Sequence, residues 1–184
     1  MLIDSTYFRN IVKLPIGEYS DIDQYIEQYE KEVLINLLGY DQYTEMMVAY
    51  NASIAEVDPV ALPAKWENLI NGMTYTYSDR SIHWNGLINS DKISFIANYV
   101  FCKYLKEHQT AMSGAGATQP KNENSVVVDG VAKYADAWNN FVKLYGYIGQ
   151  DCYEPSCLNF LIANEADYAE LYPKIYGFTN QFGI

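Results

Sequence analysis

The amino-acid sequence predicts a mainly α-helical bundle with one small β-hairpin and an irregular C-terminal tail. Apolar residues recur at three- and four-residue spacing along most of the chain, which is the periodicity of amphipathic helices. One short aromatic segment alternates instead, as a strand does, and the last stretch is aromatic without a period. With 184 residues, of which 49% are hydrophobic, the chain can fill one core. We therefore expect a single helical domain over residues 1–184.

Two helices are expected in the first third of the chain. The first begins near Ser20-Asp21, whose side chains can cap free helix amides, and ends at Gly39, which suits a left-handed position. Its apolar face comprises Ile22, Tyr25, Ile26, Tyr29, Val33 and Leu37. The second helix is capped by Asp41 and continues to about Ile54. The short connection predicts that these helices form an antiparallel pair.

A third helix is expected over residues 64–71. Pro59 and Pro63 precede it, and Gly72 ends it. The apolar residues on its face are Trp66, Leu69 and Ile70.

The aromatic segment that follows predicts a β-ribbon over residues 74–84. Its polar turn lies near Ser78-Asp79-Arg80. The residues that alternate on its two arms are Tyr75, Tyr77, Ile82 and Trp84. A lone two-stranded ribbon cannot bury both faces within a small helical domain. We expect one face to pack on the bundle and the other to be offered outward.

The second half of the chain supplies three more helices. The longest opens at Asn89 or Ser90 and has a broad apolar stripe of Ile93, Ile96, Ala97, Val100, Phe101, Tyr104 and Leu105. Small and polar residues then predict a loop over residues 113–125, which we expect to be mobile. Further helices are expected over residues 131–145 and 156–164, the latter capped by Ser156. The tail beyond them is aromatic but aperiodic.

Charge narrows the classes of partner. The chain has 12 basic and 23 acidic residues, a formal net charge of −11, which repels nucleic acid and anionic membranes. We expect neither a sequence-specific nucleic-acid partner nor a membrane partner. No apolar run approaches the roughly 18 residues of a membrane span, and the N-terminus lacks the layout of a secretory signal. The cysteines, Cys102, Cys152 and Cys157, are odd in number and are interpreted as reduced thiols.

No residue pattern predicts catalysis or a metal site. His83 and His108 are the two histidines, and neither lies beside a plausible nucleophile and carboxylate. Cys152 and Cys157 lack the further ligands of a tetrahedral zinc site. The closely spaced acidic pairs, Asp21 with Asp23 and Glu27 with Glu30, lie on predicted exposed helix turns. Dipole complementation and solubility explain these pairs. The sequence thus predicts no catalytic, cofactor-binding or metal-binding residue, no cofactor and no enzyme.

Aromatic residues are the main candidates for function. The chain has 18 tyrosines, and each phenol hydroxyl needs either a hydrogen-bond partner in the protein or contact with solvent. For the ribbon and the tail, two interpretations stay open: packing in the core, or anchoring a partner protein. The residues predicted to contact other proteins are Tyr75, Tyr77, Ile82, Trp84, Phe178 and Phe182.

Several short sequence segments together indicate a known class of protein. They are Tyr25-Ile26, Tyr29-Glu30, Leu37-Leu38-Gly39, Lys65-Trp66, Asn71-Gly72, Trp84-Asn85-Gly86-Leu87, Ala137-Trp138-Asn139 and Asn180-Gln181-Phe182-Gly183-Ile184. A chain with these segments resembles small neck proteins of tailed bacteriophages and prophages, in the class of head-to-tail connector or head-completion proteins. The resemblance covers nearly the whole chain and includes no catalytic signature.

The resemblance implies a virion assembly role without enzymatic activity. Its implied partners are portal, neck or tail components, and it implies a possible homo-oligomeric ring built by head-to-tail contacts. The implied location is the host cytoplasm during assembly and then the virion. A tail-completion or head-scaffold component is an alternative of the same class. An alternative from a different class is a small hydrolase or ligand-binding domain, with an aromatic pocket lined by Trp66, Trp84 and Trp138.

Overall fold

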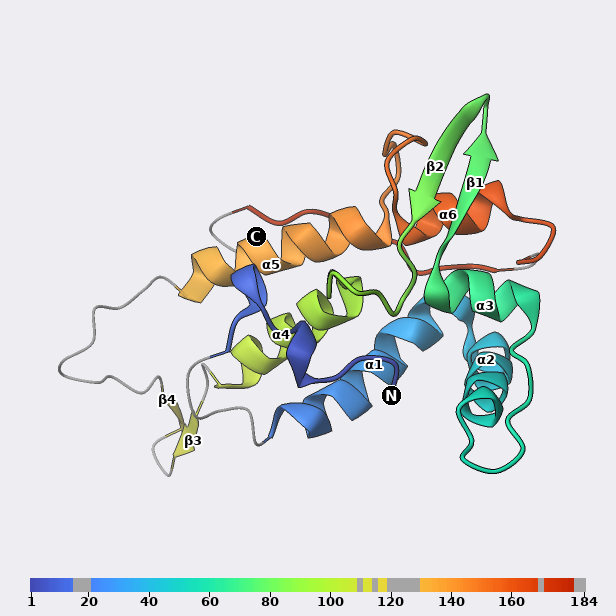
Figure 1. The fold of residues 1–184 in the computed structure, drawn as a ribbon. Helices are drawn as coiled ribbons and strands as arrows, with labels where there is room; N and C mark the ends of the chain where they lie inside the picture. The colour runs from blue at the N-terminus through green and yellow to red at the C-terminus, as the bar shows by residue number, and fades with distance from the viewer. Residues whose placement is uncertain (15–20, 109–110, 114–115, 119–129, 169–170, 181–184) are drawn as a thin grey trace.

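Helices dominate the fold, as the sequence predicts. A computed structural model describes residues 1–14, 21–108, 111–113, 116–118, 130–168 and 171–180 (Figure 1). Its α-helices are α1 (Ile22–Leu38), α2 (Tyr40–Ser53), α3 (Ala64–Asn71), α4 (Phe95–His108), α5 (Gly130–Tyr145) and α6 (Cys157–Ala163). Its shorter elements are the 3-10 helices η1 (Ser5–Tyr7) and η2 (Asn10–Val12) and the strands β1 (Met73–Tyr77), β2 (Arg80–Trp84), β3 (Ala111–Ser113) and β4 (Gly116–Thr118).

Three helices build the core, with α4 packed against both α1 and α5 (Figure 1). Their facing apolar stripes are buried, and Val33, Val100 and Phe141 are fully shielded from solvent. The buried apolar residues form one continuous cluster that runs from Leu2 to Tyr176. Burying one such side chain contributes about 1.5–3 kcal/mol, so this cluster is the main source of stability.

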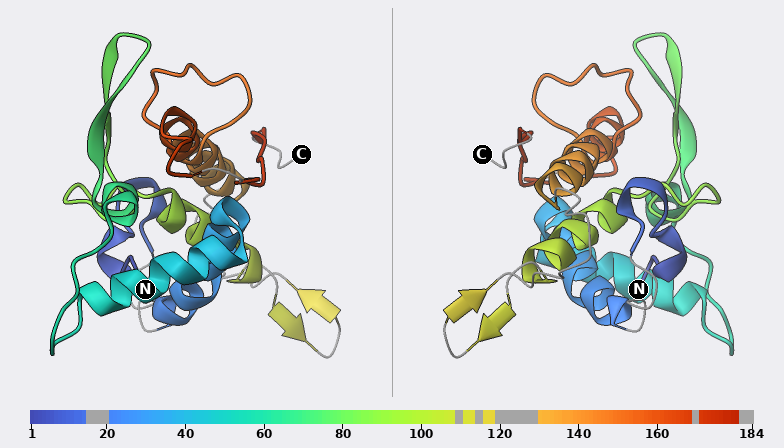
Figure 2. Two further views of the ribbon diagram at one scale, coloured as in Figure 1. Left: turned by 90° about the vertical axis from the view of Figure 1, so that its right-hand side faces the viewer. Right: turned by 90° about the vertical axis from the view of Figure 1, so that its left-hand side faces the viewer.

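The junction between α1 and α2 differs from the prediction. α1 ends at the predicted Gly39, whose φ is 78° and whose amide donates to the carbonyl of Ile35. α2 starts at the next residue with Gly39 as its N-cap, so the side chain of Asp41 is not the cap. The predicted antiparallel pairing is wrong, because α2 leaves α1 at a steep angle (Figures 1 and 2). A single linking residue is too short for the loop that an antiparallel helix pair needs.

The ribbon β1–β2 confirms the predicted hairpin. The strands pair antiparallel with Tyr75 opposite Ile82. Two residues, Ser78 and Asp79, connect them with φ values of 45° and 66°. These are the two left-handed positions of a type I′ turn, whose twist matches that of the paired strands.

A second ribbon was not predicted. β3 pairs antiparallel with β4, inside the segment expected to be a loop over residues 113–125. The loop prediction is therefore wrong for residues 113 and 116–118, because backbone pairing does not require the apolar side chains that mark a strand in sequence. Residues 114–115 and 119–125 lie outside the described residues.

Two glycines let the chain cross itself where the ribbon joins α3. A Cβ added to Gly72 would lie 2.4 Å from the carbonyl oxygen of Trp84, and one added to Gly86 would lie 2.5 Å from that of Ile70. Both glycines have positive φ, so other residues would be strained as well as crowded. After this crossing, the amide of Leu87 donates to the carbonyl of Leu69. The close crossing fixes the base of the ribbon on α3.

α4 begins later than predicted. It starts at Phe95, after Ser94, whose Oγ accepts from the backbone amides two and three residues ahead. The expected start at Asn89 or Ser90 is wrong, because the side chain of Asn89 instead bonds both backbone groups of the residue four positions later. Lys92 has a φ of 56°, which a helix does not allow. With 14 residues, α4 is also shorter than α1, which has 17.

The N-terminal segment is held by a buried carboxylate. Leu2 and Ile3 donate their backbone amides to Glu30 of α1 at 2.8 Å and 3.1 Å. Glu30 is only 3% exposed, so the prediction that it lies on an exposed turn is wrong, whereas Glu27 is exposed as expected. Burial raises the pKa of Glu30, and the hydrogen bonds from Leu2 and Ile3 oppose that shift. No sequence pattern indicates this pairing, because the partners of Glu30 are backbone groups 27 and 28 residues away.

Replacing Glu30 by alanine is expected to destabilise the fold by about 2–4 kcal/mol, because two buried backbone amides lose their acceptor. Glu27→Ala, on the exposed side of the same helix, is the matched control and should change stability by less than about 0.5 kcal/mol. Urea unfolding monitored by circular dichroism measures both. Equal effects of the two substitutions would contradict the role of Glu30 as the buried acceptor of these amides.

The raised pKa of Glu30 also predicts a pH dependence. The folded state holds the Glu30 proton more tightly than the unfolded chain does. The stability that this proton contributes is therefore fully present below about pH 4.5, the ordinary pKa of a glutamate side chain. It is lost as pH rises through the folded pKa. The unfolding free energy of the native protein minus that of Glu30→Gln should therefore fall as pH rises through this window. A difference that rises with pH would show that the pKa is lowered instead.

Candidate interaction surface

The ribbon β1–β2 carries four of the six residues predicted to contact other proteins. Tyr75, Ile82 and Trp84 are 5–6% exposed, so the prediction that they face outward is wrong. The rings of Tyr75 and Trp84 pack on Phe160 of α6, with centroids 5.7 Å and 5.8 Å away. Tyr77 is half-buried near the tip. The aromatic face of the ribbon is therefore part of the core.

The reason for this burial is the position of α6, which lies against β1 (Figure 1). α6 covers the aromatic face of the ribbon, which the sequence analysis expected to be available to a partner, and it leaves the polar face exposed. On that polar face Thr74 and His83 are hydrogen-bonded through Oγ1 and Nδ1 at 3.0 Å. The indole N–H of Trp84 donates to the buried carbonyl of Leu69 at 3.0 Å. Trp84 thus has both an apolar and a polar anchor inside the molecule.

The three tryptophans do not line one pocket. Trp66 is fully buried and packs on Tyr168, in the same aromatic cluster as Trp84. Trp138 belongs to a different cluster, where it packs on Phe141 and on neighbouring rings. The aromatic pocket of the alternative interpretation, lined by Trp66, Trp84 and Trp138, is not formed, because the rings fill two parts of the core instead of surrounding a cavity.

Two adjoining hollows lie beside α6 and the C-terminal tail. The larger, about 590 Å³, is bounded by α6 and tail residues that include Leu171 and Pro173. The smaller, about 270 Å³, is bounded by Tyr77, Tyr147 and the loop after α5. Three residues line both hollows: Leu158, Ile162 and Ile175. The hollows therefore form one surface with an apolar ridge between them.

Exposed apolar side chains gather around these hollows. Ile162 and Ile175 on the ridge are 59% and 45% exposed, and Ile148 on the loop after α5 is 81% exposed. Tyr172 is 92% exposed, next to Leu171 and Pro173 in the tail. We name the set the α6–tail surface: Tyr77, Tyr147, Ile148, Ile162, Ile175 and Phe178. Contiguous exposed apolar residues of this kind mark sites of protein contact.

Two of the predicted contact residues belong to the α6–tail surface. Tyr77 lines the smaller hollow, and Phe178 packs on Tyr147 of that hollow with centroids 4.7 Å apart. Phe178 is 48% exposed. Phe182 lies outside the described residues. The isoleucines were missed because Ile162 and Ile175 are 13 positions apart and join only in the folded chain.

The tail is fastened to the core by backbone and side-chain hydrogen bonds. The amide of Lys174 donates to the carbonyl of Asn36 on α1 at 2.8 Å. The carbonyl of Lys174 accepts from the hydroxyl of Tyr145 on α5 at 2.9 Å. Further along, the indole of Trp138 donates to the carbonyl of Gly177 at 2.8 Å. The tail thus returns across α1 and α5 without regular secondary structure, and these bonds position Ile175 and Phe178.

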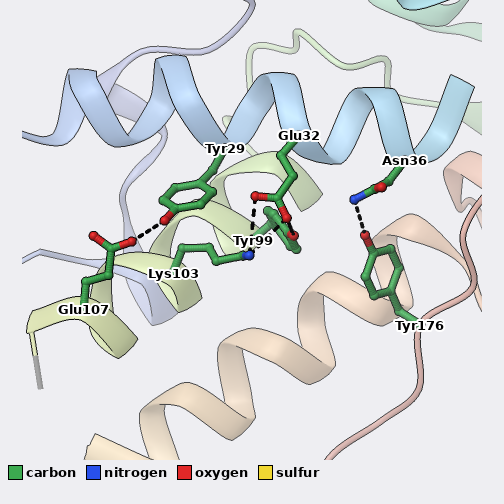
Figure 3. Close-up of polar contacts among 7 residues, drawn as sticks. All are labelled: Tyr29, Glu32, Asn36, Tyr99, Lys103, Glu107 and Tyr176. Atoms are coloured by element: carbon green, nitrogen blue, oxygen red, sulfur yellow. Dashed lines mark hydrogen bonds and ion pairs between the residues drawn. The ribbon is translucent and has the colours of Figure 1, made fainter. Parts of the chain in front are cut away.

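A row of polar side chains on α1 bonds to α4 and to the tail (Figure 3). The pairs are Tyr29–Glu107, Glu32–Tyr99, Glu32–Lys103 and Asn36–Tyr176, at 2.7–3.1 Å for the last three. The hydrogen bond to Glu107 raises the pKa of Tyr29 to about 12. Partial burial favours neutral Glu32, but the bonds from Tyr99 and Lys103 outweigh it and lower the pKa of Glu32. The row is fully paired, which suits a structural role.

The three cysteines differ in their exposure to solvent. Cys152 lines the smaller hollow, whereas Cys157 and Cys102 are buried, and burial raises the pKa of Cys102 to about 12. Across the described ranges, no three histidine, cysteine or acidic side chains are grouped so that they could hold a metal ion. No helix in the described part of the chain combines the length and the apolar character needed to span a membrane.

Comparison with known proteins adds no relative: no protein-family model, curated protein or solved structure matches this chain.

Because Trp84 belongs to the core, Trp84→Ala is expected to destabilise the fold by about 3–5 kcal/mol. Ser81→Ala, on the exposed face of the same strand, is the control and should stay within about 0.5 kcal/mol of the native protein. Thermal and urea unfolding report both changes. A Trp84→Ala protein as stable as the control would return Trp84 to the list of docking residues.

Proposed function

We propose that this chain is a non-enzymatic assembly protein of a tailed-phage virion, a head-to-tail connector or adaptor subunit that docks on portal, neck or tail components. The observation that carries the proposal is the α6–tail surface, where isoleucines and aromatic rings lie exposed around two adjoining hollows. Such side chains, centred on pockets, are the usual anchors of protein interfaces. The resemblance of the sequence to phage neck proteins supplies the class of partner.

The α6–tail surface suits docking because it is held in place before a partner arrives. Tyr176, beside Ile175, is 7% exposed and packs against Phe141 and Tyr145 of α5 with ring centroids 4.9 Å and 5.1 Å away. A tail held in this way loses little conformational freedom on binding, so more of the contact energy appears as affinity. The ridge of Ile162 and Ile175 then fits between apolar side chains of a partner, and the hollows on either side of the ridge receive those side chains.

The overall charge agrees with a subunit beside a passage for DNA. A net charge of −11 repels the phosphate backbone, so DNA passes without adhering. On this proposal the protein is made in the host cytoplasm and is then built into the virion. Its partners are proteins, and its chemistry is recognition without turnover.

Deleting the gene from the phage or prophage genome that encodes this chain is expected to leave heads and tails unjoined, with loss of infectious particles. Complementation with the native gene restores particles, whereas Ile162→Asp does not, because a carboxylate on the apolar ridge would be desolvated in the interface. Val48→Asp is the control, since Val48 is also an exposed helical residue at 66% but lies on α2, outside the α6–tail surface. Plaque titre and electron microscopy give the readout.

The chain itself should be present in purified particles, as detected by mass spectrometry. Complete particles formed without the gene, or particles that lack the chain, would contradict the proposed function. Equal complementation by Ile162→Asp and Val48→Asp would contradict the assigned surface.

A further inference from the structure

A second exposed apolar segment lies far from the α6–tail surface, in the connection between α2 and α3. Ile54, Val57 and Val60 are 59%, 79% and 62% exposed there. The segment folds back toward the end of α2, where the amide of Val60 donates to the carbonyl of Ala52 at 3.1 Å. We name residues 54–60 the acidic loop. It presents three aliphatic side chains that the rest of the described chain leaves largely exposed.

The acidic loop carries negative charge without compensation. Glu56 and Asp58 alternate with its aliphatic residues, and no basic residue occurs between Lys31 and Lys65. Within the described residues neither Glu56 nor Asp58 forms an ion pair. The loop therefore combines an apolar surface with two free carboxylates, and a complementary site would be an apolar groove with a basic rim.

The molecule contains such a groove, of about 550 Å³, between η2, α4 and α5. Its apolar side is formed by the exposed Ile11 and the half-buried Leu105, which lie over the buried Leu14 and Phe101. Lys13 and Lys133 stand on its rim, and within the described residues neither forms an ion pair. Asp136 also lines it. We name it the basic groove.

Positive charge extends beyond the basic groove into an adjoining cleft of about 220 Å³. The two hollows share Asn10 and Ile11. Together they are lined by four basic residues, Arg9, Lys13, Lys92 and Lys133, against two acidic ones, Asp91 and Asp136. In a chain with 23 acidic and 12 basic residues, a basic majority in one region is an exception that favours an acidic occupant.

The two complementary features lie at opposite ends of the molecule. The connection from α2 to α3 is at the lower right of Figure 1, whereas η2 and the N-terminal part of α5 are at the left. One chain therefore cannot place its own acidic loop in its own basic groove. Two different patches in contact make a heterologous interface, which adds copies in one direction and closes into a ring when the rotation allows.

We propose that the acidic loop of one copy docks in the basic groove of a second copy of this chain. Ile54, Val57 and Val60 contact the apolar side of the groove. Glu56 and Asp58 pair with Lys13 and Lys133 on its rim. The inference deepens the proposed function and rests on it, because it names the self-contact of an assembly subunit.

Charge reversal on purified full-length protein tests the contact, with sedimentation velocity over a concentration series as the measurement. The native chain is expected to associate. Glu56→Lys with Asp58→Lys, and separately Lys13→Glu with Lys133→Glu, should each weaken self-association by about tenfold or more in Kd, since each sets like charges against each other. A mixture of these two double variants should associate again, because each loop then meets a groove of opposite sign.

Matched controls carry the same charge changes elsewhere. Asp23→Lys with Glu27→Lys matches the loop reversal, and Lys31→Glu with Lys143→Glu matches the groove reversal; all four native residues are exposed. Both controls should associate like the native chain. Circular dichroism verifies that every variant is folded.

A native chain that stays monomeric at every concentration would overturn the contact. So would association that ignores both reversals, which would mean that another segment or another protein occupies the groove, or a mixture that fails to associate. The particle experiments separate this inference from the proposed function. A chain found in particles whose association ignores the reversals refutes only the contact, whereas charge-dependent association of a chain absent from particles refutes only the function.

Discussion

The packing of Tyr176 against the helical core is the interaction on which the rest of the structure depends. Its ring lies within 6.2 Å of Tyr99 on α4 and within 5.1 Å of Phe141 and Tyr145 on α5, measured between centroids. Its hydroxyl accepts from Asn36 on α1 at 3.0 Å. One tail residue thus joins the three core helices, although the tail has no regular hydrogen-bonded structure of its own.

That anchor decides which side chains reach the surface. Because Tyr176 is buried, its neighbour Ile175 lies beside α6 and forms the ridge with Ile162. The N-terminal segment acts similarly on another side, where Glu30 holds Leu2 and Ile3 and η2 completes the basic groove. The hollows beside α6 and beside η2 are therefore each completed by a segment near one end of the chain, which lies over helices. The core supplies rigidity, and the terminal segments supply the shape of the contact surfaces.

The two proposed contact surfaces differ in the physical source of the binding energy that they would supply. The α6–tail surface is dominated by aliphatic and aromatic groups, so area removed from water provides most of its affinity. The acidic loop and basic groove add charge complementarity, which speeds encounter and fixes orientation more than it raises affinity. Under the proposed function, contacts with other copies and contacts with other virion proteins would use separate patches and would not compete.

The sequence by itself determined the elements whose signal is local. Periodicity and end residues placed α1, α3, α5 and α6 to within one or two residues, and alternation around Ser78 and Asp79 placed the hairpin. The same signals identified Tyr75 and Trp84 as one face of the ribbon. They did not identify the direction of that face, because a ribbon has the same alternation whether its aromatic side meets solvent or another element.

Only the tertiary structure decided what each face meets. α6 lies more than seventy residues beyond the ribbon, and its Phe160 turns the expected docking face into core. Glu30 shows the same limit, since the donors to its carboxylate are backbone amides, which nearly every sequence position carries. The surfaces assigned to contact, around Ile162 and Ile175 and around Lys13 and Lys133, join residues from distant elements. Their existence is a property of packing, which brings together groups that the linear order of residues keeps apart.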